Sequence, residues 1–226
     1  VDRHWRIVQA FGMEKYARLV VDEWGCWHPA GSGPSKGANL FEQQSTMRDA
    51  VIAALTLNIF NNHCDKILLA TIAQLCNCDQ SLFLAEGDQC ICTPTYHVFD
   101  MYVNLMGDTV IDSWSQGAEQ YPTDGLKGEV LVDCIDCVAT LDSATGVITV
   151  ACINKHETQD REITLHLPVN GSATVTSLKG DSADDYNDIG RDNVRPFSND
   201  AAILERTADT LRILLPAHSV NVVRIL

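Results

Sequence analysis

The chain has 226 residues, of which 46% are hydrophobic and 20% charged, a composition typical of a globular protein with a sizeable core. Its longest weakly polar run, from Ala50 to Cys64, contains asparagine and histidine and is too short to cross a bilayer. The formal net charge of −14 opposes binding to nucleic acid and to anionic membranes, so we expect neither as a partner.

The first half alternates between strand-like and helix-like patterns. Residues 17–24 predict a buried strand, and "KILLATIAQ" predicts another. Between them, "STMRDAVIAALTLNIFNNH" predicts a largely buried helix, with Ser45 or Thr46 as its N-cap. A second helix is predicted at "TPTYHVFDMYVNLM", with Thr93 as N-cap and Pro94 at the first helical position. This alternation favours parallel β/α units.

From about Thr109 the pattern becomes that of antiparallel strands. The stretch "DCVATLDSATGVITVACINK" predicts a hairpin around its Ser-Ala-Thr-Gly turn. Strand-like runs rich in Val, Ile, Thr and Leu follow: "REITLHLPV", "SATVTSLKG" and "TLRILLPAHSVNVVRIL". We therefore expect no long helix here and an antiparallel β-sandwich.

The stretch "LVVDEWGCWH" places two carboxylates and two indoles at the end of a buried strand. Working residues of β/α proteins gather at the carboxyl ends of strands, where Asp22 and Glu23 are expected. A carboxylate flanked by indole rings suits sugar chemistry, because the ring packs on a sugar face while the acid meets the anomeric carbon. A solvated strand-end acid or half of a salt bridge is the alternative. Glycoside hydrolysis needs a second carboxyl group, and we identify none in the sequence.

Several stretches together resemble the C-terminal part of the α-L-arabinofuranosidases of glycoside hydrolase family 51. They are "VVDEWGCWH", "EQQSTMRDAVIAALTLNIFNNHCDKI", "IAQLCN", "TPTYHVFDMY" and "LPAHSVNVVRIL". They occur in the family's order and extend through nearly the whole chain. The likeness is strong over residues 19–102 and at the C-terminus, and weak over residues 112–200.

The resemblance implies the last β/α units of a (β/α)8 barrel in residues 1–106 and a jelly-roll-like β-sandwich in residues 107–226. It implies a retaining hydrolase that releases α-L-arabinofuranosyl residues from arabinose-containing polysaccharides or oligosaccharides. Glu23 corresponds to the family's nucleophile, at the end of its seventh barrel strand. Trp27 and Gln74 correspond to positions that line the sugar pocket, as a flat wall and a hydrogen-bond donor. On local grounds Trp27 could instead pack the loop and Gln74 could tie down backbone.

The family's acid/base, an Asn-Glu pair ending its fourth barrel strand, has no counterpart in this sequence. Two β/α units cannot close a barrel, so we expect a fragment that is inactive by itself. The resemblance implies a full-length homo-oligomer, and with the thiol count it favours a cytoplasmic location. No cofactor and no metal are expected. A non-catalytic carbohydrate-binding or structural β-sandwich module is the alternative function, although such a module has no use for a nucleophile at a strand end.

Nine cysteines raise the alternative of a zinc site, in a zinc-bound interaction domain. Three closely spaced pairs stand out: Cys76 with Cys78, Cys90 with Cys92, and Cys134 with Cys137. Two of these pairs have one intervening residue, which is not the usual spacing of zinc knuckles, so we interpret the cysteines as small hydrophobic core residues. "GSGPSKG" is not a phosphate-binding loop and is expected to lie flexibly over the pocket, and "DSADDYNDIGRD" is expected to be a solvated surface loop. His28 is a weaker candidate for substrate contact, and His97 is expected to be packed or exposed on its helix.

Overall fold

The computed structural model describes residues 1–28, 43–125 and 127–226. The predicted loop "GSGPSKG" lies outside these residues. At the centre is a six-stranded sheet in the order β12-β11-β15-β9-β8-β5, with antiparallel pairing throughout. Its strands are β5 (Thr109–Ile111), β8 (Ile135–Leu141), β9 (Ile148–Asn154), β11 (Ala173–Leu178), β12 (Phe197–Ser198) and β15 (Ser219–Ile225).

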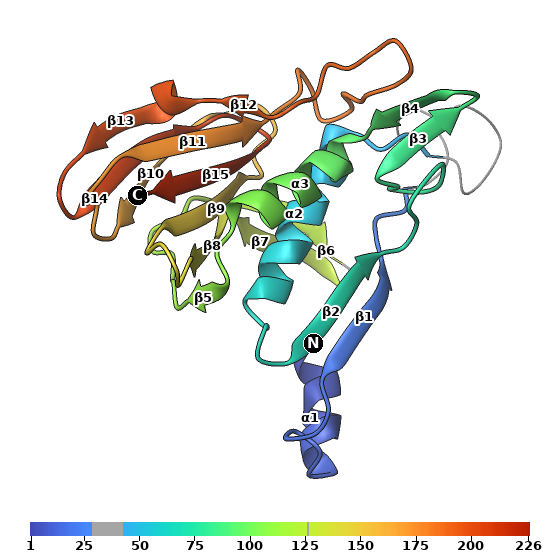
Figure 1. The fold of residues 1–226 in the computed structure, drawn as a ribbon, viewed down its shortest axis with the longest axis horizontal. Coiled ribbons are helices and arrows are strands. Elements are labelled where there is room, and N and C mark those ends of the chain that lie inside the picture. The colour runs from blue at the N-terminus through green and yellow to red at the C-terminus, as the bar shows by residue number, and fades with distance from the viewer. Residues whose placement is uncertain (29–42, 126) are drawn as a thin grey trace.

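A three-stranded antiparallel sheet covers one face of the central sheet (Figure 1). It consists of β10 (Arg161–His166), β14 (Thr210–Leu215) and β13 (Ile203–Arg206), and a short 3₁₀ turn, η1 (Asp200–Ala202), leads into β13. The two sheets enclose an apolar core, to which β14 contributes Leu211, Ile213 and Leu215. The predicted antiparallel β-sandwich is therefore confirmed.

Two helices cover the other face of the central sheet, α2 (Met47–Asn61) and α3 (Pro94–Leu105) (Figure 1). Strand β9 shows how the central sheet contributes side chains both to the core of the sandwich and to the core beneath the helices. Val150 and Cys152 point into the sandwich, whereas Ala151 and Ile153 pack with the helices. Because side chains alternate along a strand, a sheet buried on both faces needs an unbroken apolar run, which "ITVACI" supplies.

The predicted helix boundaries are confirmed closely. Thr46 is the N-cap of α2, and its backbone N–H and its hydroxyl both donate to Asp49 Oδ2 at 2.8 Å. Thr93 caps α3 by accepting a hydrogen bond from the Tyr96 backbone, and Pro94 occupies the first position. No helix of the described residues is long and apolar enough to span a membrane.

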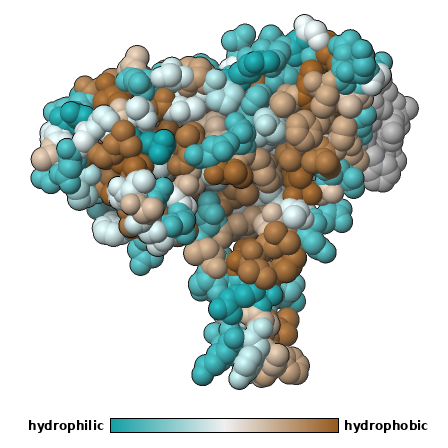
Figure 2. Space-filling model, in the orientation of Figure 1, coloured by the Kyte–Doolittle hydropathy of each residue, from teal (hydrophilic) through white to brown (hydrophobic). Residues whose placement is uncertain are grey.

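Strands β1 (Leu19–Trp24) and β2 (Ile67–Ile72) form a two-stranded parallel sheet, with α2 between them in sequence. This confirms a β/α unit, but the prediction that both strands are buried is wrong. Leu68 is 75% exposed, and Val20 and Leu69 are about half exposed. Figure 2 shows hydrophobic side chains gathered over these strands. Both strands have the apolar sequence of core strands, but the described residues cover only part of the surface of this two-stranded sheet.

Three features were not expected from the sequence. Helix α1 (Asp2–Ala10) projects from the body at the N-terminal end (Figure 1) and has no buried residue. Strands β3 (Phe83–Glu86) and β4 (Gln89–Cys92) form one hairpin, and β6 (Gln120–Gly125) and β7 (Gly128–Asp133) form another. The division at residues 106 and 107 stays a prediction. The core beneath α2 and α3 includes residues from both sides of it, among them Met101 and Val138.

Candidate functional site

Glu23 lies one residue before the carboxyl end of β1, and its side chain is exposed. Asp22 and Glu23 are both exposed, whereas Val21 and Trp24 turn inward. The pairing of β1 with β2 shifts between Val21 and Trp24, and this irregularity breaks the ordinary alternation of faces. The acid pair is thereby presented to solvent while the strand remains attached to the body.

Trp24 fixes this strand end to the helices. Its ring stacks on Phe99, with centroids 5.8 Å apart, and meets Phe60 edge-on at 5.4 Å. Aromatic pairs of this kind add about 0.5–1.5 kcal/mol to the burial of apolar area. The indole next to Glu23 is therefore a structural anchor that joins β1 to α2 and α3.

Gln74 lies at the corresponding end of β2 and is exposed. The backbone N–H of Ala73, its neighbour, donates to the Trp24 carbonyl at 2.9 Å. Glu23 and Gln74 are thus each one residue away from the same interstrand hydrogen bond. The parallel pairing brings these two predicted site residues to the same edge of the sheet.

Trp27 extends the site beyond the end of β1, with 47% of its surface exposed. Its ring folds back over Gly25, where an added Cβ would meet Trp27 Cη2 at 3.3 Å. Gly25 therefore leaves room for the indole to lie along the loop. The ring packs on this loop and still presents a large face to solvent.

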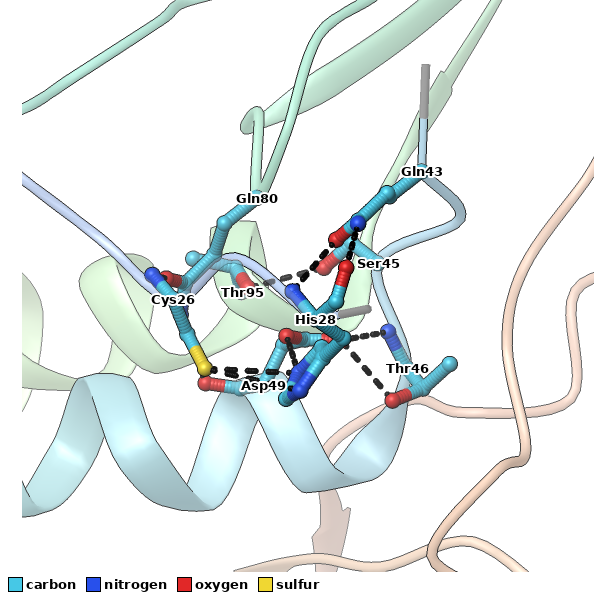
Figure 3. Close-up of polar contacts among 8 residues, drawn as sticks. All are labelled: Cys26, His28, Gln43, Ser45, Thr46, Asp49, Gln80 and Thr95. Atoms are coloured by element: carbon cyan, nitrogen blue, oxygen red, sulfur yellow. Dashed lines mark hydrogen bonds and ion pairs between the residues drawn. The ribbon is translucent and has the colours of Figure 1, made fainter. Parts of the chain in front are cut away.

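His28 contacts side chains from two elements instead of projecting outward (Figure 3). Its Nε2 lies 2.9 Å from Asp49 Oδ1, on the first turn of α2, and 3.3 Å from Cys26 Sγ. These three donor atoms all lie within 4.8 Å of one another. Within residues 1–28, 43–125 and 127–226, no other group of three or more His, Cys, Asp or Glu side chains is gathered in this way. The capping pattern Thr-x-x-Asp could have placed Asp49 at the start of α2, but nothing in the sequence indicates that it faces residues 26–28.

Two glutamine side chains hold the backbone on either side of this cluster (Figure 3). Gln80 is buried and accepts a hydrogen bond from the Cys26 N–H while donating to the Asp49 carbonyl at 2.8 Å. Gln43 accepts from the His28 N–H at 3.0 Å and donates to the His28 carbonyl. Neither glutamine was expected to have this role from the sequence.

Burial governs the electrostatics of these groups. It raises the pKa of the Cys26 thiol to about 11, with the Asp49 charge adding to the effect. The thiol is therefore protonated at neutral pH, which argues against a Cys-His nucleophile. Burial, followed by the Asp49 carboxylate, also raises the pKa of Asp79, a side chain that is almost fully covered.

The remaining sequence candidates take other roles. The three predicted cysteine pairs do not gather into a metal-ligand cluster among the described residues. Their interpretation as core residues holds for Cys134 but is wrong for Cys76 and Cys90, which are exposed on and beside the β3–β4 hairpin. His97 is half buried on α3, against the ring of Tyr96.

The acidic stretch at residues 181–192 is only partly the solvated surface loop that was expected, because two of its polar residues are buried. Asp185 is buried and pairs with Arg191, and its carbonyl accepts the Met47 N–H at the start of α2. Asn187 is fully buried and donates to the carbonyls of Cys92 and Val194. The loop is packed because its polar side chains satisfy backbone groups of neighbouring segments.

Comparison with known proteins gives a consistent picture. A family model described as the alpha-L-arabinofuranosidase C-terminal domain matches residues 22–219. An intracellular exo-alpha-L-arabinofuranosidase of Bacteroides ovatus is 29% identical over 229 aligned positions, which cover 96% of this chain and 41% of that protein. The chain therefore spans about two fifths of the length of this relative.

Solved structures show the same fold. The GH51 arabinofuranosidase from Xanthomonas axonopodis pv. citri matches with a TM-score of 0.75 and 26% identity, over 98% of this chain and 45% of that one. A thermostable GH51 alpha-L-arabinofuranosidase from Thermotoga petrophila matches with a TM-score of 0.78 and 20% identity, over 99% of this chain and 48% of that one. At such identity the second likeness concerns the fold alone.

Proposed function

Because the chain belongs to the alpha-L-arabinofuranosidase C-terminal domain family, we propose that it is the C-terminal part of a retaining α-L-arabinofuranosidase with Glu23 as nucleophile. The observation that carries the proposal is the arrangement of side chains at the carboxyl ends of the paired strands β1 and β2. There an exposed Glu23, an exposed Gln74 and the half-exposed indole of Trp27 follow two parallel strands. Ligands of β/α proteins bind at such edges.

Each residue has a definite part in the proposed reaction. The Glu23 carboxylate attacks the anomeric carbon and forms a covalent arabinosyl-enzyme, while the departing oxygen takes a proton from a second carboxyl group. Water, giving up a proton to the same second group, then attacks the anomeric carbon, breaks its bond to Glu23 and releases the sugar. Gln74 donates a hydrogen bond to a sugar hydroxyl, and Trp27 lies against the furanose ring.

The second carboxyl group belongs, in this proposal, to the rest of a (β/α)8 barrel encoded upstream. The exposed apolar side chains of β1 and β2 support this, because strands of a closed barrel are covered by helices outside and by layered side chains inside. The 226-residue chain is then inactive by itself. Its residues 107–226 form the jelly-roll-like sandwich that follows the barrel.

The relatives suggest the setting. The substrates proposed are arabinose-containing polysaccharides or oligosaccharides, from which α-L-arabinofuranosyl units are released one at a time. The Bacteroides ovatus relative is described as intracellular, which supports a cytoplasmic location for this protein. The full-length enzyme is proposed to be a homo-oligomer that needs no cofactor.

The test is the Glu23→Ala variant of the full-length protein, assayed on an aryl α-L-arabinofuranoside. We expect kcat/KM to fall about 10⁴-fold or more, because removal of a covalent nucleophile leaves only binding and acid catalysis. Added azide should restore turnover and give an arabinosyl azide of inverted configuration. Glu129→Gln, which changes an exposed glutamate on β7, is the matched control and should leave kcat/KM unchanged.

Undiminished cleavage by Glu23→Ala would overturn the proposed nucleophile. If neither the full-length protein nor the variant cleaves arabinosides but both bind arabino-oligosaccharides, the non-catalytic binding module is the correct function.

A further inference from the structure

We propose that Cys26, His28 and Asp49 form a binding site for Zn²⁺, with Cys26 Sγ, His28 Nε2 and Asp49 Oδ1 as ligands. The site joins the loop after β1 to the first turn of α2. It differs from the cysteine pairs that the sequence offered, none of which contributes a ligand.

The donor atoms of Cys26 and Asp49 both lie beside the His28 ring. Asp49 Oδ1 lies 2.9 Å from His28 Nε2, and Cys26 Sγ lies 3.3 Å from the same nitrogen and 3.8 Å from Nδ1 of that ring. In a hydrogen-bonded cluster this nitrogen has either one proton to donate or one lone pair to accept with, so it cannot satisfy both neighbours fully. When a metal ion binds, the Cys26 thiol loses its proton to solvent, and the ion accepts one lone pair from each of the three atoms.

The distances suit a tetrahedral ion. With zinc bonds of about 2.3 Å to sulfur and about 2.0–2.1 Å to nitrogen and oxygen, tetrahedral ligands lie about 3.3–3.6 Å apart. The separations from Nε2 are close to these values, and all three atoms are within 4.8 Å of one another. Because Cys26 Sγ also lies 3.8 Å from Nδ1, it sits toward the ring face and must move into line with the Nε2 lone pair when the ion binds. Thiolate, imidazole and carboxylate are also the ligand types that zinc prefers.

The surroundings orient the ligands as an outer shell does in metal sites (Figure 3). Asp49 Oδ2 accepts both hydrogen bonds from Thr46, so Oδ1 is left to face the cluster. Gln80 fixes the backbone of Cys26, and Gln43 fixes that of His28. This preorganisation means that little conformational entropy is lost when the ion binds.

The charge balance points the same way. Asp49 is almost fully buried, and Asp79, next to Gln80 in the sequence, is a second covered carboxyl group. A divalent cation would offset this buried negative charge. Three protein ligands leave the fourth position to water, because part of the His28 side chain reaches solvent.

The bound ion would restrict the movement of Trp27. This residue lies between the ligands Cys26 and His28 in the sequence, four residues after Glu23. This consequence rests on the proposed function, whereas the binding of the ion does not. Zinc would keep the loop against α2 and so hold the indole in place beside the sugar site.

The binding test uses the full-length protein freed of metal with a chelator. Zn²⁺ affinity is measured by competition with a chromophoric chelator, and Co²⁺ is added separately to detect a thiolate-to-cobalt charge-transfer band. We expect wild type to bind one more equivalent than Cys26→Ser or His28→Gln, with affinity at this site at least 100-fold weaker in both variants. Gln80→Ala should weaken it about 10–100-fold, as outer-shell changes do.

Two controls make the outcome decisive. Cys64→Ser, at an exposed cysteine beyond α2, and Glu23→Ala should both retain the full stoichiometry and the cobalt band. The proposal is overturned if Cys26→Ser and His28→Gln bind zinc as wild type does, or if the band is lost in Cys64→Ser instead. Because Glu23→Ala separates metal binding from turnover, failure of the glycosidase proposal would leave this result intact.

Discussion

Replacing Trp24 with alanine should destabilise the protein strongly, because this one indole joins the β1 strand end to both helices. The side chain is 9% exposed and makes ring contacts with Phe60 and Phe99. Truncating a buried tryptophan costs about 3–5 kcal/mol, through lost burial and the cavity that remains. At about 2–4 °C per kcal/mol for a chain of this size, the melting temperature should fall by about 6–20 °C.

The assay is thermal unfolding followed by circular dichroism, with Trp114→Ala as the matched control. Trp114 is 86% exposed, so its loss should change the melting temperature by no more than about 2 °C. If Trp24→Ala melts as the control does, the anchoring of β1 by this indole is refuted. A similar fall in both variants would show that exposure does not decide the effect.

Three further predictions concern the loop, the pocket and pH. Gly25→Ala places a Cβ 3.3 Å from Trp27 Cη2, so the indole has to shift. We expect kcat/KM of the full-length enzyme to fall severalfold while the melting temperature changes little. Unchanged kinetics would show that the position of the indole is not critical. Gln74→Ala should lower kcat/KM about tenfold, the worth of one good hydrogen bond, while Gln89→Ala on β4 should not; equal effects would contradict a sugar contact. Burial lowers the pKa of His218 from its usual 6.5, so this residue should reduce stability as pH falls below that value and have no such effect above it. Asparagine tolerates the positive φ at position 218, so His218→Asn is the suitable variant. Its melting temperature should fall less than that of wild type between about pH 7.5 and about pH 5.5. An identical fall in wild type and variant would contradict this.

The sequence predicted those parts of the fold that local chemistry determines. The polar cap Thr46 and the pair Thr93-Pro94 mark the starts of α2 and α3, and Gly146 with a positive φ completes the β8–β9 hairpin turn. The same reasoning missed the β3–β4 hairpin. Its short strands have the sequences FLAE and QCIC, and the two cysteines and the glutamine of the second give no clear alternation.

Burial was harder to predict than secondary structure. Val20 and Leu68 have the sequence environment of core residues, yet both are exposed, because burial depends on what packs against a strand and not on the strand alone. Asp185 is the opposite case. It stands in an acidic stretch that favours solvent, but it is buried with Arg191 against the start of α2.

The candidate site was predictable only where a motif carried it. The strand end at Glu23 and the position of Gln74 follow from the parallel β/α pattern and the family resemblance, and the structure places both residues at one sheet edge. The cluster of Cys26, His28 and Asp49 joins residues more than 20 positions apart. Their meeting depends on how the loop after β1 lies across α2, which no local spacing encodes.

The central claim is that Glu23 forms a covalent bond with the sugar, and trapping that bond tests it most directly. The full-length enzyme would be incubated with a 2-fluoro-arabinofuranoside bearing a good leaving group, since fluorine slows breakdown of the intermediate. Peptide mass mapping should then find the added sugar on the side chain of Glu23. A label on another carboxylate, or release of product with inverted configuration and no label, would contradict the account.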